Sequence, residues 1–217
     1  MILSRERGYL FIHIPKTGGT ALALALEARA MKGDLLVGDT PKARARRRRL
    51  AGLTAAGRLW KHSSLAELEG VLHPGEAGHL FIFTLVRNPW DRLVSYYHWL
   101  RLQRFENPAV LLANSLSFHD FLWHDHTGES LRAWPYARYL RDRDGVERCS
   151  LWIRLEQIEQ DSAPLQQHLG FSLLPLPRVN ESDRSREYRL FYTDRDAARV
   201  ADLCADDIAR FDYSFSH

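Results

Sequence analysis

Residues 11–20 read Phe11-Ile12-His13-Ile14-Pro15-Lys16-Thr17-Gly18-Gly19-Thr20, and this stretch decides the fold. An apolar run passes through a lysine and glycines into the helix-forming sequence from Ala21 to Arg29. The pattern predicts a strand that turns through glycines into the N-terminus of a helix. Backbone N–H groups at such a turn lack intrahelical acceptors and lie at the positive end of the helix dipole. We therefore expect the turn to bind an anion.

The side chains of this loop add further hydrogen-bond donors. Lys16 supplies an ammonium group, and Thr17 and Thr20 supply hydroxyls, so the loop can surround a phosphate or a sulfate. The most common phosphate-binding loop, G-x-x-x-x-G-K-[ST], places its lysine after the glycines, whereas here the lysine precedes Gly18 and Gly19. The sequence therefore excludes a Walker A loop and leaves an ordinary glycine turn as the alternative.

A second strand precedes a well-marked helix start. Residues 80–86, Leu-Phe-Ile-Phe-Thr-Leu-Val, are apolar and rich in β-forming types, which predicts a strand buried on both faces. Asn88 suits the N-cap of the next helix and Pro89 suits its first position. These signals predict a helix from Trp90 to about Arg104.

Two polar residues flank this helix start. Arg87 would lie at the carboxyl end of the strand, and Ser95 would lie about two turns into the helix, where its hydroxyl could face the same crevice. A guanidinium fork together with a hydroxyl suits a phosphate. We therefore predict a second phosphate site at Arg87 and Ser95, and we expect Arg92 to pair locally or to face solvent.

The rest of the chain alternates strands with helices. We expect a strand, a loop and a helix over residues 9–31, a strand ending at His62, and a helix from Ser64 toward Leu72 with Glu67 in a capping box. We also expect helical segments over 117–139, 157–169 and 194–210 and a strand over 150–155. This order predicts an α/β fold with a central, mostly parallel sheet flanked by helices, and with ligands at the carboxyl ends of the strands.

Composition limits the class of protein. With 217 residues and 45% hydrophobic composition, the chain can bury the core of a single domain over residues 1–217. The net charge of +3 is too small to indicate nucleic-acid binding but is compatible with a polyanionic cofactor or acceptor. Cys149 and Cys204 are far apart and lack the spacing of a metal site, so we expect reduced thiols. No apolar stretch is long enough to span a membrane.

The two predicted phosphate sites together resemble a known pair of motifs. The lysine-first loop at 15–20 and the segment Val86-Arg87-Asn88-Pro89 through Ser95 are similar to the nucleotide-binding motifs of sulfotransferases that use 3′-phosphoadenosine 5′-phosphosulfate (PAPS). The sequence most resembles the carbohydrate sulfotransferases of the heparan sulfate 2-O and chondroitin types and their bacterial relatives. The similarity covers most of the chain, including the segments 153–156, 179–182, 191–192 and 211–213.

The resemblance implies a P-loop-like fold of the nucleotide-kinase type, with PAPS as the cosubstrate. It places the 5′-phosphosulfate on the loop and the 3′-phosphate at Arg87 and Ser95. It also implies a late loop that closes over the nucleotide. The implied contacts are Lys16, Thr17, Gly18, Gly19 and Thr20 in the first loop, and Asn180, Ser182 and Arg184 in the late loop.

The resemblance also bears on the acceptor and on location. It implies that the acceptor is a hydroxyl compound, which we expect to be a carbohydrate or a glycolipid. Animal enzymes of this type are anchored in the Golgi membrane, and no signal-like stretch precedes the first strand here. We therefore expect a cytoplasmic, bacterial enzyme or a form trimmed of its anchor.

His62 is the candidate for the chemistry. It ends the predicted strand and precedes the helix opened by Ser64, so it would lie at the ligand-binding edge of the sheet. An imidazole can take the proton of an attacking hydroxyl near neutral pH, and the resembled enzymes place a catalytic histidine in this segment. Lys16 would stabilise the charge of the departing phosphate, so that no metal is needed. The alternative is a histidine that only packs beside the helix start.

Two further features have simpler explanations. His119, Asp120, His124, Asp125 and His126 crowd together, but His119 and His124 are five apart and share no helix face, so we expect an amphipathic helix or an acceptor-site wall rather than a metal site. The basic run 42–49 could attract an anionic acceptor or a nucleic acid, but an exposed face is the favoured interpretation. We expect His13 to lie in the core or to support the loop.

Two other classes of function stay open. A nucleotide or small-molecule kinase of related fold would need a lysine after the glycines and a magnesium-binding carboxylate, and we place neither. A noncatalytic module for anionic glycans would rest on the arginine run. Binding of PAP, ATP and heparin separates these two classes from a sulfotransferase.

Overall fold

The structure is a computed structural model, and it describes residues 1–177, 179, 185 and 187–216. The chain divides into two compact units, each made of two stretches of sequence. The first unit comprises Met1–Val86 with Tyr136–Val179, and the second comprises Arg87–Pro135 with Asn180–His217. The expectation of a single domain over residues 1–217 stays a prediction.

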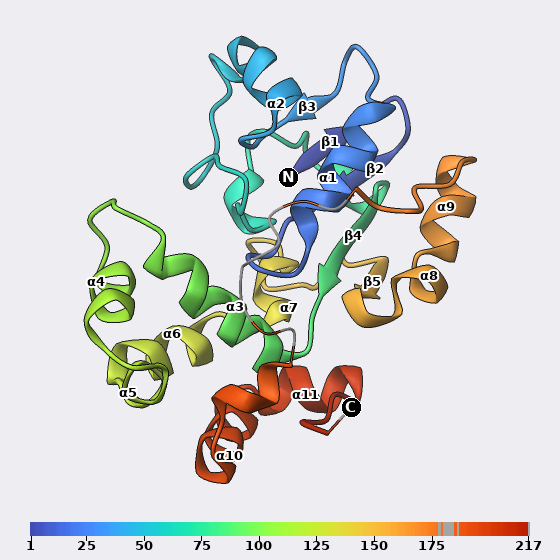
Figure 1. Cartoon of the computed structure of the whole chain (residues 1–217). Helices are drawn as coiled ribbons and strands as arrows, with labels where there is room; N and C mark the ends of the chain where they lie inside the picture. Colours follow the sequence, from blue (N-terminus) through green and yellow to red (C-terminus); the bar gives the residue numbers. More distant parts are fainter. Residues whose placement is uncertain (178, 180–184, 186, 217) are drawn as a thin grey trace. The chain divides into compact units, whose positions relative to one another are not determined.

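The first unit is built on a five-stranded sheet with strand order β3-β1-β2-β4-β5 (Figure 1). Its strands are β1 (Ile2–Ser4), β2 (Tyr9–Phe11), β3 (Leu35–Leu36), β4 (Phe81–Val86) and β5 (Leu151–Arg154). The pairs β2–β4 and β4–β5 are parallel, and Phe11 lies opposite Phe83. Strand β1 is antiparallel to both β2 and β3. The predicted α/β class is confirmed, and the sheet is mixed because β1 and β3 add an antiparallel edge.

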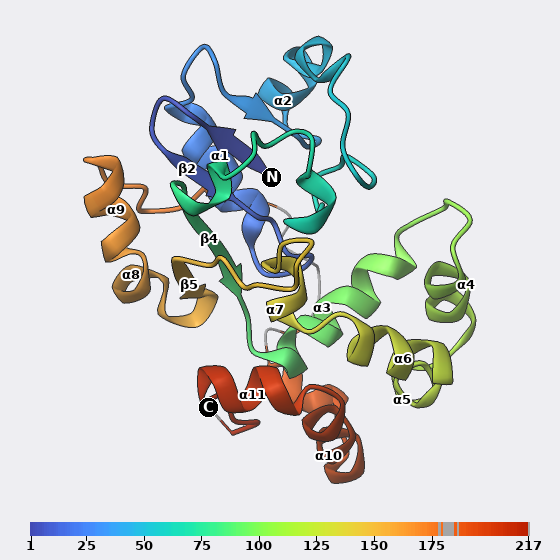
Figure 2. The same cartoon turned by 180° about the vertical axis from the view of Figure 1, so that it is seen from behind.

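Helices cover this sheet and share its core. Their bounds are α1 (Gly19–Ala28), α2 (Pro41–Ala45), α7 (Tyr136–Tyr139), α8 (Ile158–Asp161) and α9 (Ala163–Leu169). Figures 1 and 2 both show α8 and α9 alongside β5. Leu22 and Leu26 of α1 and Leu165 of α9 join Phe83 and Ile153 of the strands in one buried cluster. This packing fixes the loop between β2 and α1 at the carboxyl end of β2.

One expected strand is absent. The described backbone from Arg58 to His62 forms no strand, and that prediction is wrong. The segment turns instead, and the Ser63 hydroxyl bonds the carbonyls of Arg58 and Trp60 that a strand would have paired with a neighbour. The predicted capping contact is present, since Ser64 N–H donates to Glu67 at 2.8 Å. Only one 3-10 turn, Ala66–Leu68, follows it in place of the expected helix.

The second unit is helical. Its elements are α3 (Pro89–Arg101), α4 (Pro108–Ser115), α5 (Phe118–Trp123), α6 (Asp125–Ala133), the 3-10 turn Tyr188–Phe191, α10 (Asp194–Leu203) and α11 (Ala205–Phe211). The Asn88 side chain accepts from Trp90 N–H at 3.1 Å with Pro89 at the first turn, as predicted. Trp90 Nε1–H donates to the carbonyl of Ala197 at 2.9 Å, which ties α3 to α10. The helices of the described residues are all too short or too polar to cross a bilayer.

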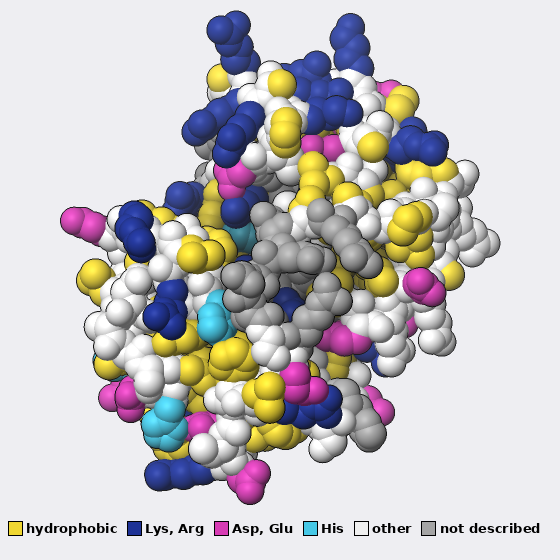
Figure 3. All heavy atoms as spheres, viewed as in Figure 1, with side chains coloured by type: hydrophobic (Ala, Val, Ile, Leu, Met, Phe, Trp, Pro, Cys, Tyr) yellow, Lys and Arg dark blue, Asp and Glu magenta, His cyan; other side chains and the backbone are white. Residues whose placement is uncertain are grey.

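The basic run divides into two sets. Lys42, Arg46 and Arg49 donate to backbone carbonyls at the end of α1 and just after it. Glu27 lies in the last turn of α1, whereas Met31 and Lys32 follow the helix, so these contacts hold the basic run against the end of α1. The remaining three arginines are exposed, and Lys and Arg side chains gather over the region of α2 (Figure 3). They are Arg44, Arg47 and Arg48.

Both cysteines are free thiols. Cys149 lies in the first unit and Cys204 in the second. Burial raises the pKa of the Cys204 thiol to about 12, so this thiol stays protonated at neutral pH.

Candidate functional site

The loop between β2 and α1 combines two left-handed residues with a helix start. Lys16 has φ 66° and Gly18 has φ 84°, and α1 begins at Gly19. The Thr17 hydroxyl donates to the carbonyl of Ile14 at 2.9 Å and holds the turn closed. Left-handed residues placed among right-handed ones turn successive N–H groups toward one concave side, and such backbone nests bind anions. The helix dipole adds to this preference.

The two glycines are required by close neighbours. A Cβ at Gly18 would lie 2.7 Å from Cδ1 of Leu155. A Cβ at Gly19 would lie 2.2 Å from Cδ2 and 2.5 Å from Nε2 of His13. Both separations are shorter than van der Waals contact, so only glycine lets the loop backbone approach these side chains.

Lys16 occupies a conformation that L-residues avoid. A non-glycine residue in the left-handed region costs about 1–2 kcal/mol. Asn, Asp or Gly would adopt φ 66° at lower cost, so the position is not chosen for the stability of the turn. Backbone strain of this kind concentrates at functional sites.

His13 lies beneath the loop. Its side chain is buried, and its ring stacks on Phe11 with a 5.7 Å centroid distance. Its ring also meets that of His62 edge-on, with centroids 4.6 Å apart. Burial, and then the neighbouring His62, hold the pKa of His13 well below its ordinary value. His13 is therefore a neutral support between the loop and His62.

His62 is held in one tautomer. Its Nδ1 lies 2.7 Å from the backbone carbonyl of His13. Because a carbonyl can only accept, Nδ1 must carry the hydrogen, and Nε2 is then the basic nitrogen of the neutral ring. Through His13, the structure brings His62 next to the loop that contains Lys16 and Gly19. His62 thus lies beside the loop even though the expected strand is absent.

A buried serine shapes the turn that leads to His62. The Ser63 Oγ lies 2.7 Å from the carbonyl of Arg58 and 2.9 Å from the carbonyl of Trp60, and it accepts from Trp60 N–H at 2.9 Å. These bonds satisfy backbone groups that a strand would have paired with a neighbour. Lys61 lies between Trp60 and His62 in the same turn. Its Nζ binds Asp39 at 2.7 Å, and this bond lowers the pKa of Asp39.

Arg87 and Ser95 lie in the second unit. Arg87 follows the last residue of β4, and its Nε and Nη2 donate to Asp91 at 2.8 and 2.6 Å. Ser95 is buried on α3. Asp91 was not predicted as the partner of Arg87, although their i, i+4 spacing at a helix start is the signal for such a pair. The predicted late-loop contacts Asn180, Ser182 and Arg184 lie outside the described residues.

His119 has a carboxylate partner. Its Nδ1 lies 2.8 Å from Oδ1 of Asp196, and Trp123 Nε1–H donates to the same oxygen at 2.8 Å. Thr193 donates to Oδ2 from both its backbone nitrogen and its hydroxyl, which forms the capping box of α10. Within the described residues, no three His, Cys, Asp or Glu side chains are grouped to hold a metal ion.

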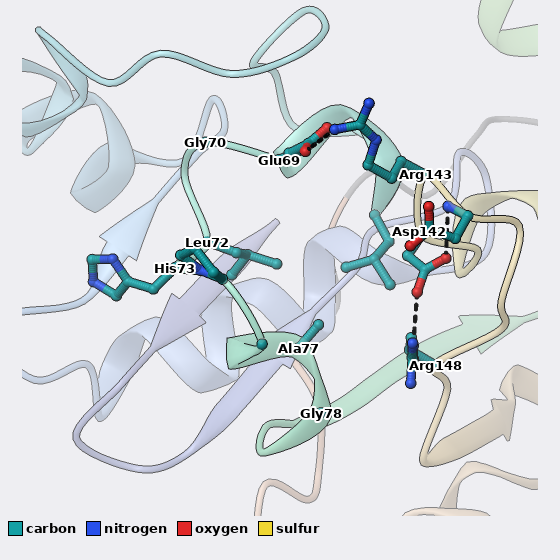
Figure 4. Close-up of a pocket in the computed structure, with 13 residues that line it drawn as sticks. Glu69, Gly70, Leu72, His73, Ala77, Gly78, Asp142, Arg143 and Arg148 are labelled. Atoms are coloured by element: carbon teal, nitrogen blue, oxygen red, sulfur yellow. Dashed lines mark hydrogen bonds and ion pairs between the residues drawn. The ribbon is translucent and has the colours of Figure 1, made fainter.

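A pocket of about 610 Å³ lies elsewhere in the first unit (Figure 4). Apolar side chains such as Leu65 and Leu72 line it. Its charged side chains pair with one another, Arg148 with Asp142 at 2.8 Å and Arg143 with Glu69. None of the predicted site residues lines this pocket, so it is not the candidate site.

Residues beyond the predicted set contribute to the site. The carbonyl of His13 orients His62, and Ser63 shapes the turn before it. The sequence signals the glycines and the histidines but gives no sign that the two rings meet across 49 residues. Such a contact follows from tertiary packing alone.

Comparisons with known proteins agree with this geometry. A profile of the sulfotransferase family matches residues 1–217. The crystal structure of mouse sulfotransferase SULT7A1 complexed with PAP is similar with a TM-score of 0.53 and 17% identity, over 96% of this chain and 86% of that one. A sulfotransferase from Alicyclobacillus acidocaldarius matches with a TM-score of 0.41 and 17% identity, over 97% of this chain and 100% of that one. No curated protein sequence matches the chain. The chain belongs to the sulfotransferase family.

Proposed function

We propose that this sulfotransferase moves the sulfuryl group of PAPS to a hydroxyl of a carbohydrate or glycolipid, with His62 as the general base. One observation carries the proposal: the Nδ1 bond of His62 to the carbonyl of His13, beside the anion-binding loop. The binding of PAP by the mouse sulfotransferase, whose fold is similar, supports PAPS as the donor. The motif resemblance at Lys16 and Arg87 supports it independently.

The loop fits a phosphosulfate group. Side chains at Gly18 and Gly19 are excluded by Leu155 and His13, so a ligand there meets backbone N–H groups directly. Lys16 adds an ammonium, and Thr20 adds a hydroxyl from the same loop. The Thr17 hydroxyl is buried and donates to Ile14, so we propose that Thr17 contributes to donor binding only by holding the turn closed. These donors match the charge and the oxygen atoms of a phosphosulfate.

The 3′-phosphate is assigned to Arg87 and Ser95 from the motif. Asp91 holds the Arg87 guanidinium through two bonds, which orients the fork before a ligand arrives. A phosphate there would meet a guanidinium that Asp91 already orients, or it would take the place of Asp91. Asn180, Ser182 and Arg184 stay proposed secondary contacts on the grounds of sequence.

The chemistry follows from these assignments. As the acceptor oxygen forms its bond to sulfur, the bond from sulfur to the bridging oxygen breaks, and His62 Nε2 takes the hydroxyl proton. Lys16 and the loop N–H groups stabilise the negative charge that grows on the departing PAP. The proposal assigns this stabilisation to the protein and to no metal ion.

Transfer of labelled sulfate from PAPS to a panel of glycans and glycolipids tests the function. We expect transfer to at least one acceptor and tight PAP binding without magnesium. Lys16→Ala should reduce both transfer and donor binding, because the ammonium contacts the donor before and during bond cleavage. Magnesium-dependent ATP binding without PAP binding would support a kinase, and heparin binding alone would support a noncatalytic module.

Arg87→Ala tests the 3′-phosphate assignment. Loss of a charge-assisted fork should weaken PAP binding by about 2–4 kcal/mol. Adenosine 5′-phosphosulfate lacks the 3′-phosphate and should lose far less affinity. Equal losses for the two ligands would reject the assignment.

A further inference from the structure

An exposed tryptophan stands next to the proposed base. Trp60 is 36% exposed although indole is largely apolar. Its ring meets the ring of His62 edge-on, with centroids 4.9 Å apart and an interplanar angle of 85°. Whatever packs on the exposed part of Trp60 therefore lies within reach of His62. An aromatic surface at this place suits an acceptor with an apolar face.

An arginine lies over the same indole. The guanidinium carbon of Arg58 is 4.9 Å from the centroid of the Trp60 ring, and the Arg58 side chain is exposed. Contact with an aromatic face restricts the guanidinium, whose N–H groups form a planar fork along its edge. That edge matches the two oxygens of a carboxylate or a sulfate.

Backbone hydrogen bonds fix the positions of Arg58, Trp60 and His62 relative to one another. Ser63 is fully buried, and its hydroxyl bonds the backbone of both Arg58 and Trp60. The backbone N–H of Ser63 also donates to the Trp60 carbonyl at 3.2 Å. His62 is fixed in the same turn by its bond to His13. The order guanidinium, indole and imidazole is therefore built into the fold.

We propose that Arg58 and Trp60 form the acceptor subsite and that the acceptor is a sugar ring bearing an anionic group. This inference rests on the proposed function. The apolar C–H face of the sugar packs on Trp60, its carboxylate or sulfate binds Arg58, and a hydroxyl of that sugar or its neighbour meets His62. The nearby Lys61 is already paired with Asp39, which leaves Arg58 to select the charge.

Equilibrium binding in the presence of PAP tests the subsite. The probes are an unsulfated chondroitin oligosaccharide, the same oligosaccharide with its carboxyl groups reduced to alcohols, and its sulfated form. We expect the wild-type protein to bind an anionic form at least about tenfold more tightly than the reduced form. The unsulfated and sulfated probes show whether carboxylate or sulfate is preferred.

Variants separate a built site from diffuse charge. Arg58→Gln should erase the preference for the anionic probe, and Trp60→Ala should weaken all probes by about tenfold. Arg48→Gln removes the same charge from an exposed position of the first unit and should leave the preference intact. Trp60→Phe should retain most of the binding, which guards against a general loss of folding in Trp60→Ala.

Two kinds of result would overturn the acceptor subsite at Arg58 and Trp60. A preference that survives Arg58→Gln, or one that Arg48→Gln lowers equally, would overturn it. Preference for the reduced sugar, or for a phenol, would do the same. If PAP binds and sulfate is transferred while these results appear, only the subsite fails, whereas absence of PAP binding and transfer rejects the proposed function itself.

Discussion

Two histidines, one in each unit, have the same local restraint and different surroundings. His62 and His119 each use Nδ1 for a hydrogen bond, the first to the carbonyl of His13 and the second to the carboxylate of Asp196. An imidazole oriented by a carboxylate is the arrangement usually associated with catalysis. Here the pair of imidazole and carboxylate is His119 with Asp196, and none of the contacts described for His119 involves the candidate anion-binding loop. The hydrogen bond of a histidine therefore does not by itself identify the base.

The carboxylate of Asp196 has a structural task. Burial would raise the pKa of Asp196, but hydrogen bonds from Thr193 and Trp123 hold it below its ordinary value. The same carboxylate caps α10 through Thr193. His119 is thus one of several hydrogen-bonding partners of the buried Asp196 carboxylate, which caps α10. His62 instead bonds a neutral carbonyl, and its ring contacts that of His13.

The two histidines should differ most in how strongly their substitution lowers the rate of sulfate transfer. We expect His62→Ala to lower sulfuryl transfer by about 10²-fold or more, the usual contribution of a general base. PAP affinity should stay within a few-fold, because the proposed function assigns donor binding to the loop and not to His62. His119→Ala should leave the transfer rate within about threefold.

The same pair of variants can reverse the assignment. If His119→Ala causes the larger loss at unchanged PAP affinity, the base lies on α5. If His62→Ala abolishes PAP binding or unfolds the protein, His62 is a structural residue. Circular dichroism and PAP titration, run beside the kinetic assay, separate these outcomes.

The structural role of Asp196 can be measured through the free energy of unfolding. Asp196→Asn places an NH₂ group opposite two donors, so the free energy of unfolding should fall by about 3 kcal/mol. Asp194→Asn changes the same charge at an exposed position in the first turn of α10 and should cost less than about 1 kcal/mol. Urea denaturation measures both. Equal effects would mean that the buried network contributes little.

The link between the loop and the histidines can be tested at Gly19. A methyl group there overlaps the His13 ring, and overpacking of this kind should lower the free energy of unfolding by about 2 kcal/mol. In a His13→Ala background the cost of Gly19→Ala should fall below about 1 kcal/mol, since the overlap is gone. Gly78→Ala, whose Cβ would have no neighbour within 4 Å, is the control. Additive effects at residues 13 and 19 would show that the two do not touch.

The sequence predicts the parts of this site that depend on local signals. The glycine loop, the strand before Arg87 and the Asn88 cap follow from short-range rules that the structure bears out. The prediction of a strand from Arg58 to His62 fails because tertiary contacts take up the backbone of this segment: the Ser63 hydroxyl bonds two of its carbonyls, and the N-terminal ammonium donates to the carbonyl of Lys61. No local pattern in the sequence reveals these tertiary contacts.

The side-chain contacts were the least predictable. Three features depend on tertiary packing: the left-handed Lys16, the contact between His13 and His62, and the bond from Lys42 to the Glu27 carbonyl of α1. The pairing of Arg87 with Asp91 is the exception, because its spacing was readable. Sequence therefore predicts the residues of the candidate site, and tertiary packing decides what each one contacts.

The smallest expected effect is a pH dependence that only the buried histidine should produce. Burial, and then His62, lower the pKa of His13, so the unfolded chain takes up a proton below about pH 6.5 that the folded protein does not. The contribution to stability is therefore present above pH 6.5 and is lost as the pH falls toward the folded pKa, by at most about 1.4 kcal/mol per pH unit. Urea denaturation between pH 7.5 and about 5.5, above the range where most carboxylates titrate, measures this slope. His13→Gln should flatten it whatever its effect on absolute stability, because glutamine cannot titrate. If wild type and His13→Gln show the same slope, folding does not lower the pKa of His13, and the role of His13 as a neutral support beneath the loop is ruled out.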